Sequence, residues 1–229
     1  MSYEKNEDVF YVGNIGKTLP TSNGFKSTIV KLSKNGTVNL GEIKLYNIFP
    51  TMLDIQGITI DENDDTIWFC STGENKIRHI TKAGVEIESI DLDKPTGIVY
   101  DNRTNTLWVL TYTKLLNINK DGKIIDSINI SIEGQDQLFL DESKNIMYFT
   151  AGVNYHSDNY VYKIDLSTKK IDLVFKLKDS YCVEGIYIEN GIMYILNDGY
   201  YHSGKNPINQ LNKYDINQLL TEKQYKELI

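Results

Sequence analysis

A ladder of bulky aromatic residues at a fixed spacing constrains this chain more than any other feature of its sequence. Trp68, Trp108 and Tyr148 stand 40 residues apart, and Tyr194 follows 46 residues later. Self-similarity with a period of about 40 residues is typical of repeat proteins, in which each copy is one supersecondary unit. The ladder therefore predicts a repeat architecture in which these aromatic side chains pack between neighbouring units.

An acidic residue stands just upstream of each aromatic residue, every 40 residues in the first three copies and at the equivalent position in the next. These acids are Asp61, Asp101, Asp141 and Glu189. A run of alternating apolar residues precedes each acid, and turn-forming residues follow it, which is the pattern of a strand that enters a tight hairpin.

The pattern of one copy of the repeat predicts four consecutive β-strands. Residues 57–61 alternate with a period of two and 66–70 are rich in β-formers, so together they predict a hairpin. After a short polar loop, residues 76–80 predict a third strand, and residues 85–90 predict a fourth beyond a glycine turn. Four antiparallel strands thus fill about 40 residues.

Four-stranded units of this length stack around an axis as a β-propeller. We predict one all-β domain over residues 1–229, a five-bladed β-propeller of four-stranded antiparallel blades with a short C-terminal helix. The first copy is truncated and lacks an obvious innermost strand. The predicted blades span residues 8–50, 54–93, 94–133, 134–180 and 181–216, and the amphipathic helix spans 217–229. This helix either covers the seam of the propeller or docks onto a partner.

Composition excludes several classes of function. The net charge of −7, the pI of about 5.0 and the lack of a Lys/Arg cluster argue against nucleic acid as a partner. No apolar stretch is long enough for membrane insertion, and the N-terminus has no signal-peptide pattern, so we expect a cytoplasmic or virion location. Cys70 and Cys182 lack metal-type spacing and are expected to be buried and reduced.

Three phrases of the sequence resemble those of a known group of propellers. Residues 183–188 (VEGIYI), 193–198 (MYILND) and 56–60 (QGITI) are similar to the repeat phrases of SdiA-regulated and NHL-type propellers. Gluconolactonase-like propellers are more distantly similar. The resemblance covers four copies, and because its motifs are structural it implies the fold and not an activity.

The residue just before the innermost strand of a propeller blade tends to face the central channel. The equivalent positions in this chain are Gln56, Thr96, Asp136 and Glu184. Two of these four residues are acidic, so the channel mouth is expected to be polar.

The resemblance to gluconolactonase-like enzymes implies a divalent cation at this mouth. Those enzymes hold the cation with one Glu and a few Asn or Asp side chains, and oxygen ligands of this kind suit calcium or magnesium. Gln56 and Thr96 do not complete such a set, so a purely structural cation and a polar channel without a metal stay open as alternatives. The implied ligands are Glu184, Asp136, Asn197 and Asp198.

Long polar and aromatic loops in the first, fourth and fifth blades predict a binding face. They cover residues 13–24, 152–159 and 199–207, and scaffolded loops commonly build binding surfaces. The triplet Tyr-His-Ser begins at Tyr155 and recurs at Tyr201. A shared loop turn and a His156/His202 metal pair are the alternative interpretations. The candidate binding residues are Tyr155, His156, Asp158, Tyr200, Tyr201, His202 and Lys205.

These features lead to a main hypothesis and two alternatives. No nucleophile elbow, phosphate-binding loop or dinucleotide fingerprint is present, so we assign no catalytic residue and no required cofactor. The main hypothesis is a non-catalytic module that binds a partner protein or a surface carbohydrate, as a phage or virion-associated component. The first alternative is a metal-dependent lactonase or esterase. The second is a subunit that docks into a larger assembly through its open blade edge and C-terminal helix.

Overall fold

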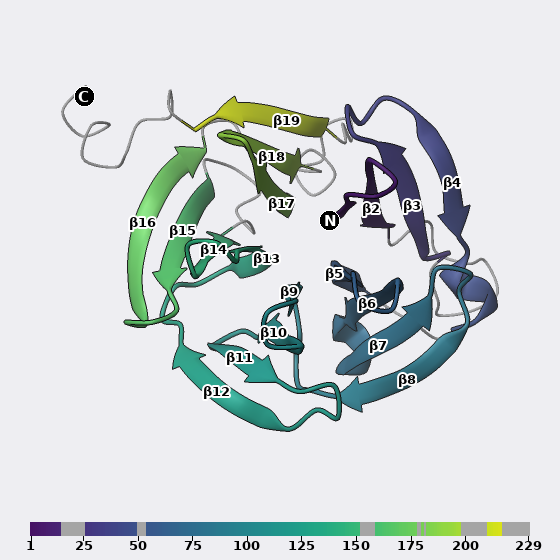
Figure 1. Ribbon diagram of the computed structural model, residues 1–229, viewed down its shortest axis with the longest axis horizontal. Helices are drawn as coiled ribbons and strands as arrows, with labels where there is room; N and C mark the ends of the chain where they lie inside the picture. Colours follow the sequence, from purple (N-terminus) through teal and green to yellow (C-terminus); the bar gives the residue numbers. More distant parts are fainter. Residues whose placement is uncertain are drawn as a thin grey trace. The chain divides into compact units, whose positions relative to one another are not determined.

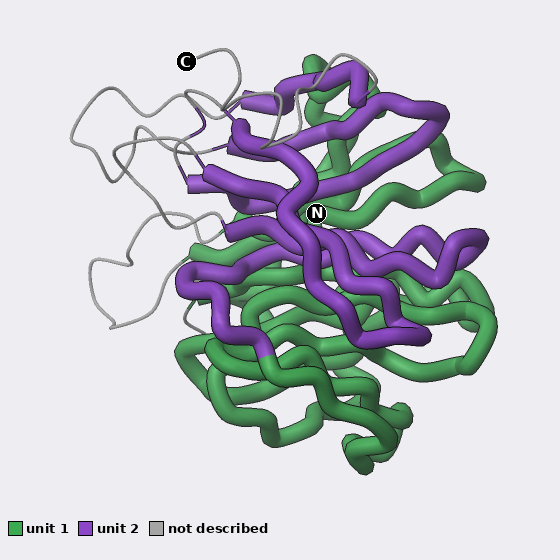
Figure 2. Tube along the Cα trace, turned by 90° about the vertical axis from the view of Figure 1, so that its left-hand side faces the viewer, with its two compact units in different colours: residues 1–129 green, residues 130–229 purple. Residues whose placement is uncertain are grey.

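The computed structural model describes residues 1–14, 26–49, 54–151, 159–177, 180, 182–197 and 210–216. The chain divides into two compact units, residues 1–129 and 130–229, which Figure 2 shows in different colours. The described residues form antiparallel β-sheets with two short 3₁₀ turns, Leu45–Asn47 and Thr72–Glu74. The predicted C-terminal helix, residues 217–229, lies outside the described residues.

The first unit contains three four-stranded sheets, each in chain order from an inner to an outer strand (Figure 1). The first sheet has β1 (Ser2–Glu4), β2 (Val9–Asn14), β3 (Thr28–Ser33) and β4 (Asn39–Ile43). The second has β5 (Ile55–Asp61), β6 (Thr66–Ser71), β7 (Lys76–Thr81) and β8 (Glu86–Asp91). The third has β9 (Ile98–Asp101), β10 (Thr106–Leu110), β11 (Lys114–Ile118) and β12 (Ile124–Asn129).

The second unit contains two sheets with the same strand order. The fourth sheet has β13 (Gln135–Asp141), β14 (Ile146–Ala151), β15 (Asn159–Asp165) and β16 (Lys170–Leu177). The fifth has β17 (Val183–Glu189), β18 (Ile192–Asn197) and β19 (Gln210–Asp215). Within the described part of the chain this last blade therefore has three strands, where the sequence predicted four.

The five sheets confirm the prediction of an all-β fold built from five propeller blades. One detail of that prediction was wrong, because the first blade does have an innermost strand. β1 pairs antiparallel with β2, in the register Ser2 to Tyr11 and Glu4 to Val9. The blade thus begins at residue 2 and not at residue 8, since a three-residue strand is too short to show a period of two.

The repeated acid caps the turn between the first two strands of a blade. A side-chain oxygen of Asp61 accepts a hydrogen bond from the backbone N–H of Asn63 at 3.0 Å, and Glu4 does the same for Asn6 at 3.0 Å. Each turn also contains an Asn or Asp at positive φ, a conformation that these two residues tolerate better than most. These residues are Asp8, Asp65, Asn105, Asn145 and Asn190.

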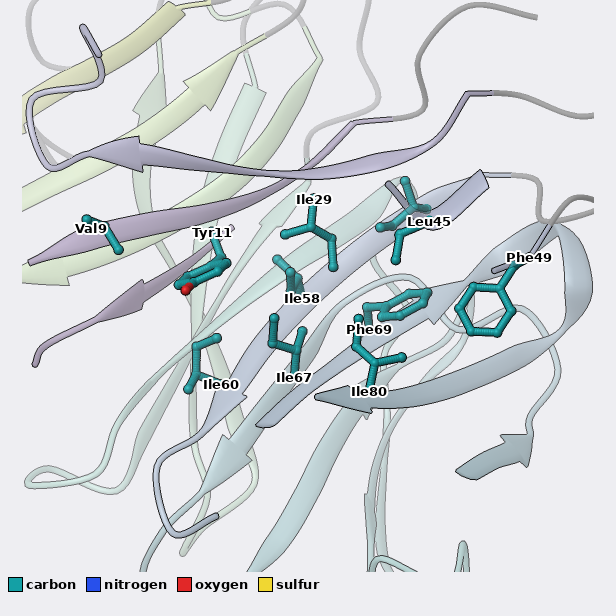
Figure 3. Packing of buried hydrophobic residues seen from close by; sticks show 11 residues of the cluster. Val9, Tyr11, Ile29, Leu45, Phe49, Ile58, Ile60, Ile67, Phe69 and Ile80 are labelled. Atoms are coloured by element: carbon teal, nitrogen blue, oxygen red, sulfur yellow. The ribbon is translucent and has the colours of Figure 1, made fainter. Parts of the chain in front are cut away.

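The core of the first unit lies between neighbouring blades. Figure 3 shows the cluster in which side chains from the first two blades interdigitate, among them Tyr11, Ile29, Ile58 and Phe69. Trp68 is fully buried in a second cluster with residues of the third blade, including Ile98 and Leu107. The predicted role of this aromatic residue between blades is confirmed for Trp68.

Candidate functional site

Three of the four predicted channel positions lie where β-bulges interrupt the innermost strands. In the second blade Ile55 pairs with Ser71 and Ile58 with Phe69, so β5 carries one more residue than β6 across this interval. The same irregularity occurs in β13 and β17. A bulge bends its strand and re-aims the side chains within it. The residues that these three bulges contain include Gln56, Asp136 and Glu184.

In the first unit the bulge region joins two blades through their backbones. The N–H of Gly57 donates a hydrogen bond to the carbonyl oxygen of Thr96 at 2.6 Å. The Gln56 amide donates to Asp54, and the Thr96 hydroxyl donates to the carbonyl oxygen of Leu110 at 3.4 Å. The polar groups of Gln56 and Thr96 are therefore used in contacts within the protein.

In the second unit Asp136 is almost fully buried. Its exposed fraction is 5%, and it accepts a hydrogen bond from the Gln137 amide at 3.3 Å. The backbone N–H of Gln137 donates to the Thr150 hydroxyl of β14 at 3.1 Å, which fixes the bulge against its neighbouring strand. The strand that carries Asp136, β13, contacts β17 of the fifth blade.

Glu184 lies beside a buried thiol. The Cys182 thiol donates to Oε1 of Glu184 at 2.7 Å, and Cys182 itself has a positive φ of 48°. Non-glycine residues rarely adopt this conformation, so the surrounding structure must hold Cys182 in place. Asn197 is buried and pairs with Val183 at the edge of the same bulge. The thiol neighbour of Glu184 was not foreseen from the sequence.

The structure brings the implied metal ligands only partly together. Asp136, Glu184 and Asn197 lie at the bulges of the second unit, whereas Asp198 lies outside the described residues. Within the described ranges, no group of three or more His, Cys, Asp or Glu side chains is placed to hold a metal ion. The calcium or magnesium site thus stays a prediction.

The predicted loop face also stays a prediction. All of its candidate residues fall in segments outside the described part of the chain, namely Tyr155, His156, Asp158, Tyr200, Tyr201, His202 and Lys205.

A lysine cluster that the sequence analysis missed connects the first two blades. The Nζ of Lys82, in the turn before β8, lies 2.9 Å from Oε2 of Glu4 and 2.8 Å from Oε1 of Glu7, and it also pairs with Asp65. Glu4 is only 2% exposed, so Lys82 is the partner of a buried carboxylate. Hydrogen bonds from Lys31 and Lys82 lower the pKa of Glu7 to about 2.

The next pair of blades repeats this arrangement. Lys120, in the turn before β12, pairs with the fully buried Asp61 and lies 3.3 Å from Oδ2 of Asp64. Burial lowers the pKa of the Lys120 ammonium group, but the hydrogen bond to Asp61 and the negative charges of Asp61 and Asp64 together raise this pKa above its ordinary value. In both cases the lysine stands two residues before a turn glycine, and this spacing is the signal that could have revealed the contact.

The outer strands of the first unit expose aliphatic side chains at equivalent positions. In each of β4, β8 and β12 a bulge introduces one extra residue opposite the third strand, and that residue is Leu40, Ile87 or Ile125. Each is about half exposed, and a second exposed aliphatic residue lies within two positions of it. We call these six residues the aliphatic rim: Val38, Leu40, Val85, Ile87, Ile124 and Ile125.

The fold places the chain in the class of β-propellers. Its particular features are polar residues at the inner bulges and the aliphatic rim. No family model and no curated protein sequence matches it. Solved structures are similar in fold. A chain in the crystal structure of a nidogen/laminin complex matches with a TM-score of 0.64 and 14% identity, over 96% of this chain and 76% of that one.

Two further structures show how varied the proteins of this fold are. A streptogramin B lyase matches with a TM-score of 0.54 and 18% identity, over 93% of this chain and 67% of that one. A protein of unknown function from Bacteroides caccae matches with a TM-score of 0.54 and 13% identity, over 93% of both chains. At these identities the likeness shows the fold alone.

The described ranges contain no helix that is long and apolar enough to cross a membrane.

Proposed function

We propose that this chain is a non-catalytic binding module that recognises a partner protein through the aliphatic rim of its first three blades. The observation that carries the proposal is that Leu40, Ile87 and Ile125 occupy the same bulge position in three blades and are each about half exposed. Single exposed apolar residues are ordinary on protein surfaces, but a repeated set of aliphatic pairs offers anchors for a partner. A propeller in a nidogen/laminin complex is consistent with protein binding by this fold.

The finer parts of the functional hypothesis belong to the same proposal. Four parts of it rest on the sequence. They are a second binding face around Tyr155 and His202, a surface carbohydrate as ligand, a role as a phage or virion-associated subunit, and membership of the SdiA-regulated type. The aliphatic rim is the part of the proposal that rests on residues the structure describes.

Site-specific photocrosslinking tests this proposal in cells that naturally make the protein. Benzoylphenylalanine at position 87 is expected to give a discrete crosslinked species, because Ile87 is 48% exposed and would lie in the interface. Leu40→Ser combined with Ile125→Ser should weaken that species if the rim acts as one surface. The control is benzoylphenylalanine at Lys170, an exposed residue of β16. Absence of a species from position 87, or the same species from position 170, would contradict the proposal.

A metal-dependent lactonase or esterase is the second candidate. The observation that favours it is that Asp136 and Glu184 occupy equivalent bulges of two strands in contact, β13 and β17. A calcium or magnesium ion held there would polarise a lactone carbonyl, and a carboxylate would act as the base toward water.

Thermal unfolding with calcium or magnesium tests this second candidate. A cation that binds only the native state raises the unfolding midpoint as its concentration rises. The candidate predicts a rise that Glu184→Ala removes and that Glu189→Ala, at the far end of the same strand, retains. If neither cation raises the midpoint of the unsubstituted chain, the lactonase hypothesis fails.

A further inference from the structure

The formal charge of the chain is concentrated in its second blade. Residues 54–93 contain ten Asp and Glu against three Lys and Arg, which gives −7, the net charge of the whole chain. The flanking parts of the first unit are slightly positive: residues 1–53 contain six basic and four acidic residues, and residues 94–129 contain five and three. The second blade is therefore an acidic element between two basic ones.

On the outer strand of this blade, β8, each acidic side chain is more exposed to solvent than the basic side chain with which it pairs. Glu86 pairs with Arg78 at 2.5 Å, and the two side chains are 38% and 11% exposed. Glu88 lies 3.0 Å from His79, with exposed fractions of 42% and 5%. Asp91 pairs with Lys76, and it is 85% exposed against 32% for the lysine. In all three pairs the carboxylate is the more exposed group, so an approaching molecule meets negative charge.

Aliphatic anchors lie among these carboxylates. Val85 is 62% exposed and Ile87 is 48% exposed, and Glu86 stands between them. Aliphatic and acidic side chains thus alternate along the start of β8. A ligand that matches this pattern must supply apolar side chains and positive charges at a similar spacing.

The outer backbone edge of β8 restricts the kinds of partner that can bind there. No described strand pairs with the outer edge of β8, and β8 lacks the lysines that commonly protect such edges. A second copy of the chain would bring carboxylates against carboxylates, which is unfavourable. The bulge at Ile87 interrupts a continuous backbone ladder, so side chains would carry most of the recognition.

We infer that β8 and Val85 form the docking site for an extended, basic segment of a partner protein, in which aliphatic residues alternate with lysine or arginine. This inference rests on the proposed function and assigns its partner chemistry. The aliphatic residues of the segment contact Val85 and Ile87. Its basic residues, which lie on one side of an extended chain, contact Glu86 and Asp91, whose partners Arg78 and Lys76 lie on the same face of the sheet.

A designed peptide tests the inference without knowledge of the natural partner. The probe is a labelled twelve-residue peptide that alternates lysine with valine, and its counterpart alternates glutamate with valine. Fluorescence anisotropy should show saturable binding of the lysine peptide to the full chain and none of the glutamate peptide. Raising the salt from about 0.05 M to about 0.5 M should weaken binding several-fold, because exposed charges are screened.

Two matched variants locate the site. Ile87→Ser should weaken binding of the lysine peptide by about tenfold, as expected for an interface anchor, whereas Ile125→Ser should change it by less than about twofold. Ile125 has the same bulge position and similar exposure but lies in a blade without the negative charge. Circular dichroism on both variants checks that they fold.

The outcomes separate this inference from the proposed function. Equal losses from the two variants, equal binding of both peptides, or no binding of the lysine peptide would each overturn the inference. If position 87 still crosslinks to a natural partner in these cases, the proposed function stands and only the chemistry assigned to the partner is wrong. If position 87 yields no crosslinked species either, both fail.

Discussion

Replacing Lys82 with methionine is expected to lower the free energy of unfolding by about 3–5 kcal/mol, the usual cost of removing one partner from a buried ion pair. Methionine keeps most of the apolar stem, so the change mainly removes the charge. Glu4 is 2% exposed and would lose the ammonium group that lies 2.9 Å from its carboxylate. Glu7 and Asp65 would lose the same partner. Urea unfolding at pH 7 measures the effect.

The pH dependence distinguishes lost charge from lost packing. The pKa of Glu7 is lowered to about 2 in the folded protein, so its stabilising contribution is complete above its ordinary pKa near 4.5 and is lost as the pH falls toward 2. Lys82→Met removes one of the two lysines that lower the pKa of Glu7, so the difference from the unsubstituted chain should shrink between pH 4.5 and pH 2. A difference that stays constant over this range would contradict the electrostatic explanation.

A surface ion pair provides the control for this variant. Lys5 lies 3.1 Å from Glu62, and their side chains are 64% and 35% exposed. Lys5→Met should cost less than about 1 kcal/mol, as is usual for exposed pairs. If Lys82→Met costs no more than Lys5→Met, Lys82 does not hold the first two blades together.

The strands and hairpins could be predicted because their signals are local. An acid at the end of the inner strand and an Asn or Asp at positive φ fix each turn within a few residues, as at Asp61 and Asp65. These signals repeat, so the number of blades followed from their period. The innermost strand of the first blade escaped because Ser2–Glu4 is short, although Glu4 occupies the acid position of the repeat.

The candidate sites were harder to predict because they depend on register and on contacts between blades. That Asp136 and Glu184 occupy equivalent bulges follows from the pairing of two strands, which the pattern of either strand alone does not show. The lysine contacts join residues such as Lys82 and Glu4, which are 78 positions apart in the chain. The aliphatic rim reads in the sequence as ordinary strand alternation, and only the structure shows that Ile87 is exposed.

Replacing Gly57 with alanine is expected to lower the free energy of unfolding by about 3 kcal/mol, at the upper end of the usual cost of overpacking. A Cβ atom at this position would lie 2.6 Å from the backbone nitrogen of Ile98 and 2.6 Å from the carbonyl oxygen of Thr96. Both neighbours are backbone atoms of the next blade, so no side chain can move aside. Separating the strands would also lengthen the hydrogen bond between Gly57 and Thr96, which now measures 2.6 Å.

Gly13→Ala is the matched control for Gly57→Ala, because a Cβ atom there would also approach the second blade but with more room. Its nearest neighbours would be the carbonyl oxygen of Gln56 and Cγ1 of Ile55, both at 3.3 Å, and a shift of a few tenths of an ångström relieves these contacts. We expect a cost below about 1 kcal/mol for this variant in the same urea titration. If Gly57→Ala lowers the free energy of unfolding as little as Gly13→Ala does, the first three blades can separate at their inner strands. The close contact at Gly57 would then not be what fixes the spacing of the second and third blades.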